Sequence, residues 1–548
     1  MRTREFEPFF STLLEEDHPS LWAEFWAAKR RVGGNRHFIQ ASGLYERSSV
    51  GRINLYPLFV ELVARYLGAN GRAGIIVPSA ISMDAYNAAL FRWLLESSRI
   101  VSLLDFENAG ELFPSVHRSY RFCLFTITGL TGSPQDISLC YFAHSVLELA
   151  DPRRRVSLTR NDIRTFSPNT LSPPILQGVD DKEIAIRCYR RLGVFRDRHR
   201  GGAGAWKAAV QRMLSLSDDG DLFRRHEELA EEHLAVFERL YSGKTIHAFN
   251  HRFATFDGGD WRPSTEAELS DPEFAPTTEY YAMSTEITSR LAAKWPSRWL
   301  VGYRDIARAT DERTSIAAII PRVGCDTHCR NIYLGIEDPV LAGCLVANMN
   351  AFAFDYLARQ KIIGTGMGAG VLEQLPVLPP SLYATSCDWS RATSMRSWVG
   401  NRMLELTFTS VDLKEFAEDC GWTGSPFLWS EERRFLLRCE LDAAFFHLYL
   451  PADRSGDWCS DESESEEGRA RLKASLPNPR DAISYIMGTF PIVRRKDVGK
   501  FSGDYRTMRV ILEMYDAMQQ AIRTGEPYRT RLDPPPADPR VAHAPRRS

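Results

Sequence analysis

Between residues 54 and 128, hydrophobic and polar positions follow first a helical and then a strand-like period. Along residues 55–67 the large apolar side chains recur every three or four positions, which is the spacing of one helical face. They are Leu55, Leu58, Phe59, Leu62, Val63, Tyr66 and Leu67. Asn70-Gly71 is a tight-turn pair, and the β-branched run at 74–77 that Pro78 closes predicts a strand.

A second helix and two further strands are predicted downstream. Ser82 is a suitable cap for the helix. Its expected buried face is Tyr86, Leu90, Phe91, Leu94 and Leu95. Residues 100–106 and 122–128 are the next two strands. The order of helix, buried strand, helix, strand, turn and strand predicts an α/β fold, and it forms only half of an open sheet.

Two motifs in this stretch resemble the later motifs of the gamma-class N6-adenine DNA methyltransferases. They are residues 70–78, Asn-Gly-Arg-Ala-Gly-Ile-Ile-Val-Pro, and residues 112–116, Leu-Phe-Pro-Ser-Val. The resemblance is greatest to the large type IIG and phage-defence methylases of restriction-modification systems. It implies the C-terminal half of a Rossmann-like methyltransferase sheet and puts Phe113 where the family's aromatic residue touches the flipped base. A phenylalanine packed at the strand edge would explain the same position equally well.

Two other motifs of that family are expected before Asn54 and are not found in residues 1–53. They are the Gly-x-Gly turn that holds the cofactor and the Asn-Pro-Pro-aromatic loop that grips the target amino group. The adjacent prolines at 173–174, 379–380 and 534–536 do not fit that loop. We therefore expect no catalytic and no cofactor-binding residue in this chain. S-adenosylmethionine is implied only if an N-terminal half from a neighbouring gene completes the enzyme.

Residues 244–255, Lys-Thr-Ile-His-Ala-Phe-Asn-His-Arg-Phe-Ala-Thr, resemble a further signature of these methylases. Ser242 and Asn250 stand where the family has acidic residues. His247 and His251, with Glu238, suggest a metal site, but no further ligand spacing supports one. Cys325 and Cys329 likewise lack a second ligand pair. We prefer a structural strand that carries basic groups near DNA, and we predict no metal.

Residues 299–322 and 359–380 are similar to the opening and closing segments of target-recognition domains in type IIG enzymes and type I specificity subunits. The implied partner is double-stranded DNA. Because the formal net charge is −2, any contact with DNA must come from local basic groups. The predicted DNA-binding residues are Lys244, His251, Arg252, Arg304, Arg308, Arg313, Arg322 and Lys361.

The predicted organisation has six parts. They are a helical segment at 1–53, the half methyltransferase domain at 54–150, a helical linker at 151–240, a target-recognition domain at 241–380, a mostly helical region at 381–530 and a disordered tail at 531–548. In the first part, Phe6 to Leu14 and Trp22 to Trp26 have helical patterns, and Gly33-Gly34-Asn35 predicts a loop. The acidic run Ser460–Glu467 is expected to be a disordered insertion.

Composition is that of a globular chain, with 44% hydrophobic and 25% charged residues. No signal peptide is visible, and no apolar run approaches the ~20 residues that span a bilayer. We expect a cytoplasmic protein without a membrane partner.

Together these patterns predict the C-terminal half of a site-specific adenine methyltransferase. The alternatives are a DNA-binding or specificity subunit without methyl transfer, and an inactive gene remnant.

Overall fold

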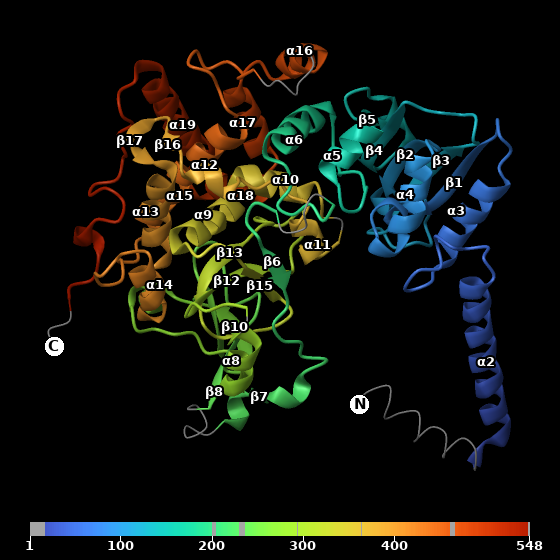
Figure 1. Ribbon diagram of the computed structural model, residues 1–548, viewed down its shortest axis with the longest axis horizontal. Coiled ribbons are helices and arrows are strands. Elements are labelled where there is room, and N and C mark those ends of the chain that lie inside the picture. Colours follow the sequence, from blue (N-terminus) through green and yellow to red (C-terminus); the bar gives the residue numbers. More distant parts are fainter. Residues whose placement is uncertain are drawn as a thin grey trace. The chain divides into compact units, whose positions relative to one another are not determined.

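The computed structural model describes residues 17–199, 204–229, 236–292, 294–362, 364–460 and 466–545 (Figure 1). The helix expected at Phe6 to Leu14 and most of the acidic insertion lie outside these ranges. The chain divides into two compact units. Unit 1 is 1–164 with 170–173, and unit 2 is 165–169 with 174–548.

Unit 1 is built on one five-stranded sheet with the order β1-β3-β2-β4-β5. Its strands are β1 Arg72–Pro78, β2 Ile100–Glu107, β3 Arg121–Thr128, β4 Asp136–Ala143 and β5 Val156–Thr159. Its helices are α2 Pro19–Ala41, α3 Leu55–Tyr66 and α4 Ala88–Glu96, and α5 Arg160–Phe166 leads into unit 2. The predicted helices and strands of residues 54–128 are all present, whereas β4 and β5 were not predicted.

The strand directions bring several chain segments to one edge of this sheet. β3 is antiparallel to both β1 and β2, and β4 is parallel to β2. The carboxyl ends of β1, β2 and β4 therefore lie at the same edge, together with the start of β3. In open α/β sheets this is the edge where ligands usually bind.

The apolar face identified on α3 is only partly buried, and three of its large side chains are exposed. Leu55 is 68% exposed, Phe59 59% and Tyr66 77%. The face that packs inward adjoins this one and shares Leu58 with it. Its buried residues are Pro57, Leu58, Val60, Glu61 and Ala64. The helix is apolar on both sides, and the side with the larger residues has no cover within the described part of unit 1.

The buried face of α3 is fixed by a polar anchor. The Glu61 carboxylate is fully buried and accepts hydrogen bonds from the Ser48 hydroxyl at 2.6 Å, from the Ser48 N–H at 3.0 Å and from Arg65 at 3.1 Å. A buried carboxylate is tolerated only when such donors surround it. These contacts set the rotation of the helix, which apolar spacing alone does not reveal.

β1 is the end strand of the sheet and lies beside α3 (Figure 1). Its apolar run, Gly74 to Val77, is typical of a strand covered on both faces. In the structure Ile76 is 57% exposed, and no described strand pairs along the outer edge of β1. The sheet is therefore open at β1.

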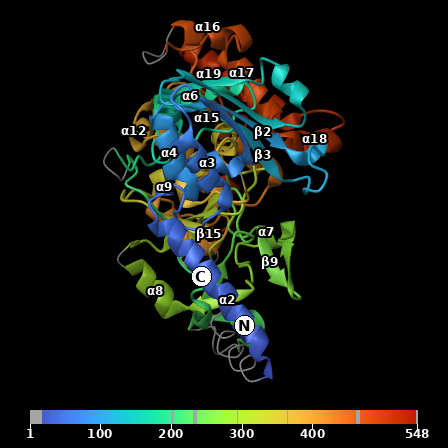
Figure 2. The ribbon, with the colours of Figure 1, turned by 90° about the vertical axis from the view of Figure 1, so that its right-hand side faces the viewer.

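Two predictions for the helices of unit 1 are corrected. α2 continues through Gly33-Gly34-Asn35 as one uninterrupted helix, with no loop and no buried residue (Figure 2). In α4 the predicted apolar face is buried except at Tyr86. Tyr86 lies in the turn before the helix and is 47% exposed. Asp84 caps that turn and Asn87 stands at the N-cap of α4, so Ser82 is not the cap.

Unit 2 contains two four-stranded sheets, β13-β12-β15-β6 and β14-β8-β11-β7. Their strands are β6 Ala209–Gln211, β7 Phe223–Arg225, β8 Phe237–Tyr241, β11 Tyr280–Met283, β12 Trp299–Arg304, β13 Ala317–Pro321, β14 Gly324–Cys325 and β15 Cys329–Tyr333. Two hairpins are formed by β9 Ala254–Asp257 with β10 Asp260–Pro263 and by β16 Ser386–Cys387 with β17 Ser390–Ser394. The helical linker expected at 151–240 is corrected, because β5, β6, β7 and the start of β8 lie there.

The rest of unit 2 is mostly helical. The helices up to residue 383 are α6 Val179–Leu192, α7 Glu266–Ser270, α8 Ser284–Ala292, α9 Pro339–Asn350, α10 Phe352–Arg359, α11 Ala369–Leu372 and α12 Pro380–Tyr383. The later helices are α13 Met395–Thr407, α14 Lys414–Asp419, α15 Glu431–Tyr449, α16 Glu466–Ser475, α17 Pro479–Gly488, α18 Pro491–Lys500 and α19 Arg506–Thr524. The predicted fold class is thereby confirmed: an α/β sheet is followed by an α+β region and a helical region.

α15 is the central helix of this region. The Tyr449 hydroxyl donates to Pro376 O at 2.8 Å and accepts from Asn348 at 2.7 Å. The ring of His447 stacks on Tyr515 of α19 with centroids 3.9 Å apart, and its Nε2 donates to Tyr515 O at 3.2 Å. These buried contacts fix α15 against α9 and α19.

α9 and α10 form a pair bent by 59°. Among the described residues no single helix is long and apolar enough to cross a bilayer. Within the same residues, α9 and α10 together are the one pair of helices with that combined length and apolar character. Both helices are almost entirely buried inside unit 2.

The tail expected to be disordered is ordered from residue 531 to 545. Leu428 N–H donates to Val541 O, and His543 N–H donates to Pro426 O, both at 2.8 Å. Leu532 is only 5% exposed. Prolines favour an extended backbone, and here the extended chain forms hydrogen bonds with unit 2.

Candidate functional site

At the carboxyl edge of the unit 1 sheet, Asp105 is the central polar group. It is fully buried near the end of β2. Its carboxylate accepts from Arg121 at 2.6 Å, from the Phe142 N–H at 3.0 Å and from the Ser79 hydroxyl. These donors come from β3, β4 and the turn after β1. Asp105 therefore ties four chain segments together beneath this edge.

Asn108, just after β2, holds the loop that carries Phe113. Its Nδ2 donates to Phe113 O at 3.0 Å and to Val116 O at 2.7 Å, and its Oδ1 accepts from Phe113 N–H at 3.0 Å. Glu111 adopts the left-handed backbone conformation, with φ of 54°. The loop is thus pinned from inside by a buried side chain.

The ring of Phe113 is partly exposed at this edge. It is 39% exposed and meets Phe122 edge-to-face, with centroids 4.9 Å apart. Phe122 in turn stacks on the buried ring of Phe106 at 5.4 Å. Phe113 therefore lies on an aromatic core with part of its ring accessible. Its contact with a flipped base stays a prediction.

In unit 2, residues 242–253 form turns instead of the predicted strand, closed by a bridge between His247 and Asn250. Arg304 fixes this turn segment, because its side chain donates to Gly243 O at 2.7 Å and to Ile246 O at 2.5 Å. Lys244 is exposed and lies 5.7 Å from the ring of Trp261.

Positive charges gather around His247. Burial, together with the charges of Arg304, Arg438, Arg313 and Lys496, lowers the pKa of His247 to about 3. The imidazole is therefore neutral at pH 7. These cations come from β12, α15, the loop before β13 and α18, so distant parts of the sequence supply one basic region. We call these four cations, with Lys244 and Arg308, the basic surface.

The members of the basic surface differ in how their charges are used. Arg313 donates to Asp355 at 2.7 Å and also to Asn350 O. Lys496 forms an ion pair with Glu312. Arg308 is exposed, and within the described residues its guanidinium has no hydrogen bond or ion pair. Lys244 and Arg308 are thus the two predicted DNA-binding residues that are exposed and whose side chains form no hydrogen bond or ion pair within the described residues.

The prediction of DNA contact is corrected for Arg252 and His251, because both are buried. Arg252 is 0% exposed, and its guanidinium donates to the carbonyls of Leu269, Asp271, Phe274 and Thr409. Burial lowers its pKa to about 10, so it stays charged at neutral pH. His251 is 2% exposed, and burial lowers its pKa well below the usual value.

Lys361 is likewise used within the protein. Its amine donates to Phe166 O at 2.8 Å and to the Ser167 hydroxyl. Burial lowers the pKa of Lys361 to about 7. It contributes less than a full positive charge at neutral pH, so it is poorly suited to a DNA phosphate.

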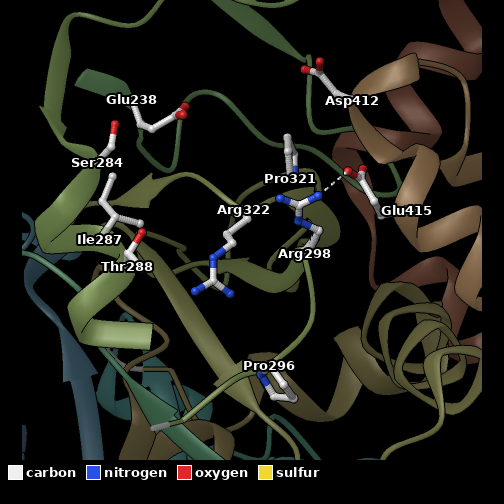
Figure 3. A pocket seen from close by; sticks show the side chains of 10 residues that line it. All are labelled: Glu238, Ser284, Ile287, Thr288, Pro296, Arg298, Pro321, Arg322, Asp412 and Glu415. Carbon is white, nitrogen blue, oxygen red and sulfur yellow. Dashed lines mark ion pairs between the residues drawn. The ribbon is translucent and has the colours of Figure 1, made fainter. Parts of the chain in front are cut away.

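Arg322 borders a separate open hollow of about 590 Å³ (Figure 3). Arg322 donates to Ser297 O at 3.0 Å, and Arg298 forms an ion pair with Glu415 at 3.7 Å. Glu238 and Asp412 also line the hollow. Three carboxylates therefore face two guanidiniums, a balance that does not favour binding of a phosphate.

No group of three or more His, Cys, Asp or Glu side chains with metal-binding geometry occurs in the part of the chain that the structure describes. His247 instead stacks on Phe253, with ring centroids 4.6 Å apart.

Residues 32–113 match the family of Eco57I restriction-modification methylases. The matched segment runs from the middle of α2 through α3, β1, α4 and β2 to Phe113. It thus contains Asp105, Asn108 and the Phe113 loop, but none of unit 2.

Two solved structures align with the chain. One is described as the type IIL restriction-modification enzyme MmeI in complex with DNA, with 10% identity and a TM-score of 0.38. The alignment covers 79% of this chain and 53% of that one. The other is the type IIG restriction endonuclease BpuSI, with 11% identity, a TM-score of 0.25 and coverage of 70% and 50%. The chain spans about half the length of either enzyme. A comparison with curated proteins gave no match.

Sequence patterns missed several residues of these two regions. Asp105 and Asn108 lie in or beside an apolar strand, and only the sheet topology reveals their partners. Arg438 lies in a helix rich in charges, so nothing singled it out. For α18, the run Arg494-Arg495-Lys496 was a visible signal of a basic helix.

Proposed function

We propose that this chain is the C-terminal half of a site-specific adenine DNA methyltransferase of a restriction-modification or phage-defence system. The observation that carries the proposal is the methylase match at residues 32–113, because it covers the segment that builds the carboxyl edge of the unit 1 sheet. A base inside a duplex must leave the stack before its amino group can be methylated. The partly exposed ring of Phe113, held by Asn108, suits contact with such a base.

The methyl donor would be S-adenosylmethionine, but the residues at this edge do not fit a cofactor site. Asp105 is fully buried and already accepts from three donors, and one carboxylate oxygen of Glu107 lies 3.1 Å from His144 Nε2. Neither carboxylate is free to hold a ribose. We therefore propose that the cofactor is held by a completing half from a neighbouring gene.

The open side of unit 1 supports such a completing half. Most of the exposed large apolar side chains among the described residues belong to unit 1, although it is the smaller unit. An unpaired strand edge with exposed apolar residues is a surface on which another strand can pair. β1 has this edge, and the exposed stripe of α3 lies beside it.

The test is methyl transfer with both halves present. The chain and the candidate completing half would be mixed with duplex DNA and labelled S-adenosylmethionine, and the nucleosides would then be separated. We expect N6-methyladenine only when both halves are present. If the two polypeptides bind each other and bind duplex DNA without transferring methyl groups, the proposed function is refuted.

A DNA-binding or specificity subunit without methyl transfer is the second candidate. The basic surface of unit 2 favours it, because this surface alone would be enough for phosphate contacts. Duplex binding by the single chain, with no methyl transfer in any combination, is the result that this candidate predicts.

A further inference from the structure

Arg438 on α15 has no partner for its charge. Within the described residues its guanidinium makes no hydrogen bond and no ion pair, although it is only partly exposed. Asp442 and Glu431 are the acids that act on it, but neither lies within ion-pair distance. An arginine that is partly desolvated and unpaired is costly to keep unless a ligand supplies the missing acceptor.

Contacts one turn away on either side place Arg438 at the basic surface. Arg434, four residues before it, donates to Phe249 O at 3.3 Å in the turn that contains His247. Asp442, four residues after it, accepts from Phe352 N–H at 2.8 Å. Residues four apart share one helix face. Arg438 therefore faces the strip between the His247 turn and Phe352.

The same strip connects to α18. The Arg313 guanidinium lies 4.1 Å from the ring of Phe352, which meets Phe490 edge-to-face at 4.8 Å. α18 begins directly after Phe490, and its Lys496 reaches back to Glu312 in the loop of Arg313. These three contacts bring α18 and this loop together at Phe352, which Asp442 of α15 also contacts.

α18 adds free positive charge to this region. Arg494 and Arg495 are exposed, and within the described residues their side chains have no hydrogen bond or ion pair. Lys496 forms its ion pair with one acid, Glu312. A face with several cations and few free acids is complementary to a polyanion.

We propose that Arg438 binds a phosphate of the DNA backbone. The guanidinium fork matches two phosphate oxygens, which gives the contact direction as well as charge. Arg494 and Arg495 extend the contact to neighbouring phosphates. This inference deepens the proposed function and rests on its DNA-binding part, but not on methyl transfer.

The test compares Arg438→Gln with Arg391→Gln, which removes one exposed charge from β17. Duplex binding to the full chain would be measured by fluorescence anisotropy at several salt concentrations. For Arg438→Gln we expect roughly tenfold weaker binding at low salt. The slope of log K against log salt should fall in magnitude by about 0.9, the value for one lost phosphate contact. Arg391→Gln should change neither quantity.

Thermal melting separates binding from a structural role. Since Arg438 has no partner to lose, Arg438→Gln should melt at or above the wild-type temperature, whereas a structural arginine would lower it. Arg438→Lys should restore part of the slope but less of the affinity. An unchanged slope for Arg438→Gln overturns the proposal, even if the two halves transfer methyl groups.

Free phosphate is the other source of the same chemistry. Inorganic phosphate would be titrated into both proteins during melting. If phosphate stabilises the wild type and not Arg438→Gln while the DNA slope is equal for both, the site binds free phosphate and the DNA assignment is wrong.

Discussion

Replacing Arg252 by methionine should destabilise the protein and leave DNA contacts intact. The sequence suggested that Arg252 touches DNA, because it lies in the signature at 244–255 that resembles one of the large methylases. In the structure both terminal nitrogens of the Arg252 guanidinium donate hydrogen bonds within unit 2. Nη1 donates to Asp271 O at 2.8 Å and Phe274 O at 3.1 Å, and Nη2 donates to Leu269 O at 2.9 Å and Thr409 O at 3.0 Å.

The size of the effect follows from what methionine leaves behind. Four carbonyls lose their donor, and the contacts with two of them, Leu269 O and Thr409 O, are buried. Each unsatisfied buried group costs about 1–3 kcal/mol before relaxation. Because the backbone can shift and water can enter, we expect a net loss of about 3–5 kcal/mol, the range for breaking a buried charged contact. Arg252→Lys should recover only a small part, because one amine cannot reach all four carbonyls.

Urea unfolding of the full chain, followed by tryptophan fluorescence, measures this loss. Arg262→Met is the matched control, because Arg262 lies on the nearby β10 and forms its ion pairs with Asp257 and Glu268 at the surface. The control should unfold close to the wild type. If Arg252→Met is as stable as the control and flattens the salt dependence of duplex binding, our interpretation of Arg252 is wrong.

Three further predictions concern exposure and pH. Phe59→Ser should leave the melting temperature nearly unchanged, whereas Leu58→Ala should lower the free energy of unfolding by about 2–5 kcal/mol, because of these two residues only Leu58 is buried. Equal losses of stability in the two variants would contradict the exposure of Phe59 on α3. With the completing half present, Phe113→Ala should slow methylation by roughly tenfold to a hundredfold. It should lose less stability than Phe106→Ala, which should cost about 3–5 kcal/mol. If Phe113→Ala melts at a lower temperature than Phe106→Ala, Phe113 is a core residue. Burial lowers the pKa of His447 to about 4, so the unfolded chain takes up the proton first as the pH falls below about 6.5. Stability should therefore fall by about 3 kcal/mol between pH 7 and pH 4 through this group, and His447→Phe should show a correspondingly shallower pH dependence in urea unfolding.

The sequence predicted which segments form helices and strands better than it predicted which face of each is buried. Apolar spacing identified α3 correctly, but both of its faces are apolar, and the polar anchor at Glu61 decides which one turns inward. Periodicity cannot detect such an anchor. The aromatic loop at Phe113 was located from a motif, while its support by Asp105 and Asn108 depends on which strands are neighbours.

Amino-acid composition led to wrong expectations about the order of the C-terminal tail and about the position of β1 in the sheet, for related reasons. A tail rich in proline and arginine resembles a disordered segment, yet its backbone finds hydrogen-bond partners at Pro426 and Leu428. The run Gly74 to Val77 resembles a central strand, yet its outer edge has no partner in the described part of unit 1. In both cases the deciding quantity is whether backbone groups are paired, which depends on the rest of the fold.

Net charge is a poor guide to where this protein meets a polyanion, because many of its arginines are consumed internally. Arg402 and Glu440 lie 2.7 Å apart in the helical core, and Arg313 is held by Asp355. Such pairs cancel in the sum of charges and also remove their cations from any outside contact. The cations that remain available are those with no partner in the described chain. By this criterion most of the DNA-binding positions predicted from the sequence are excluded, whereas Arg438 and the exposed arginines of α18 are included.

The free cations belong to unit 2 and the Phe113 edge belongs to unit 1. Variants of the free cations should therefore change the salt dependence of DNA binding, and variants at the Phe113 edge should change the rate of methyl transfer. A variant at either place that moves both measurements equally would mean that the two functions are not divided between the units.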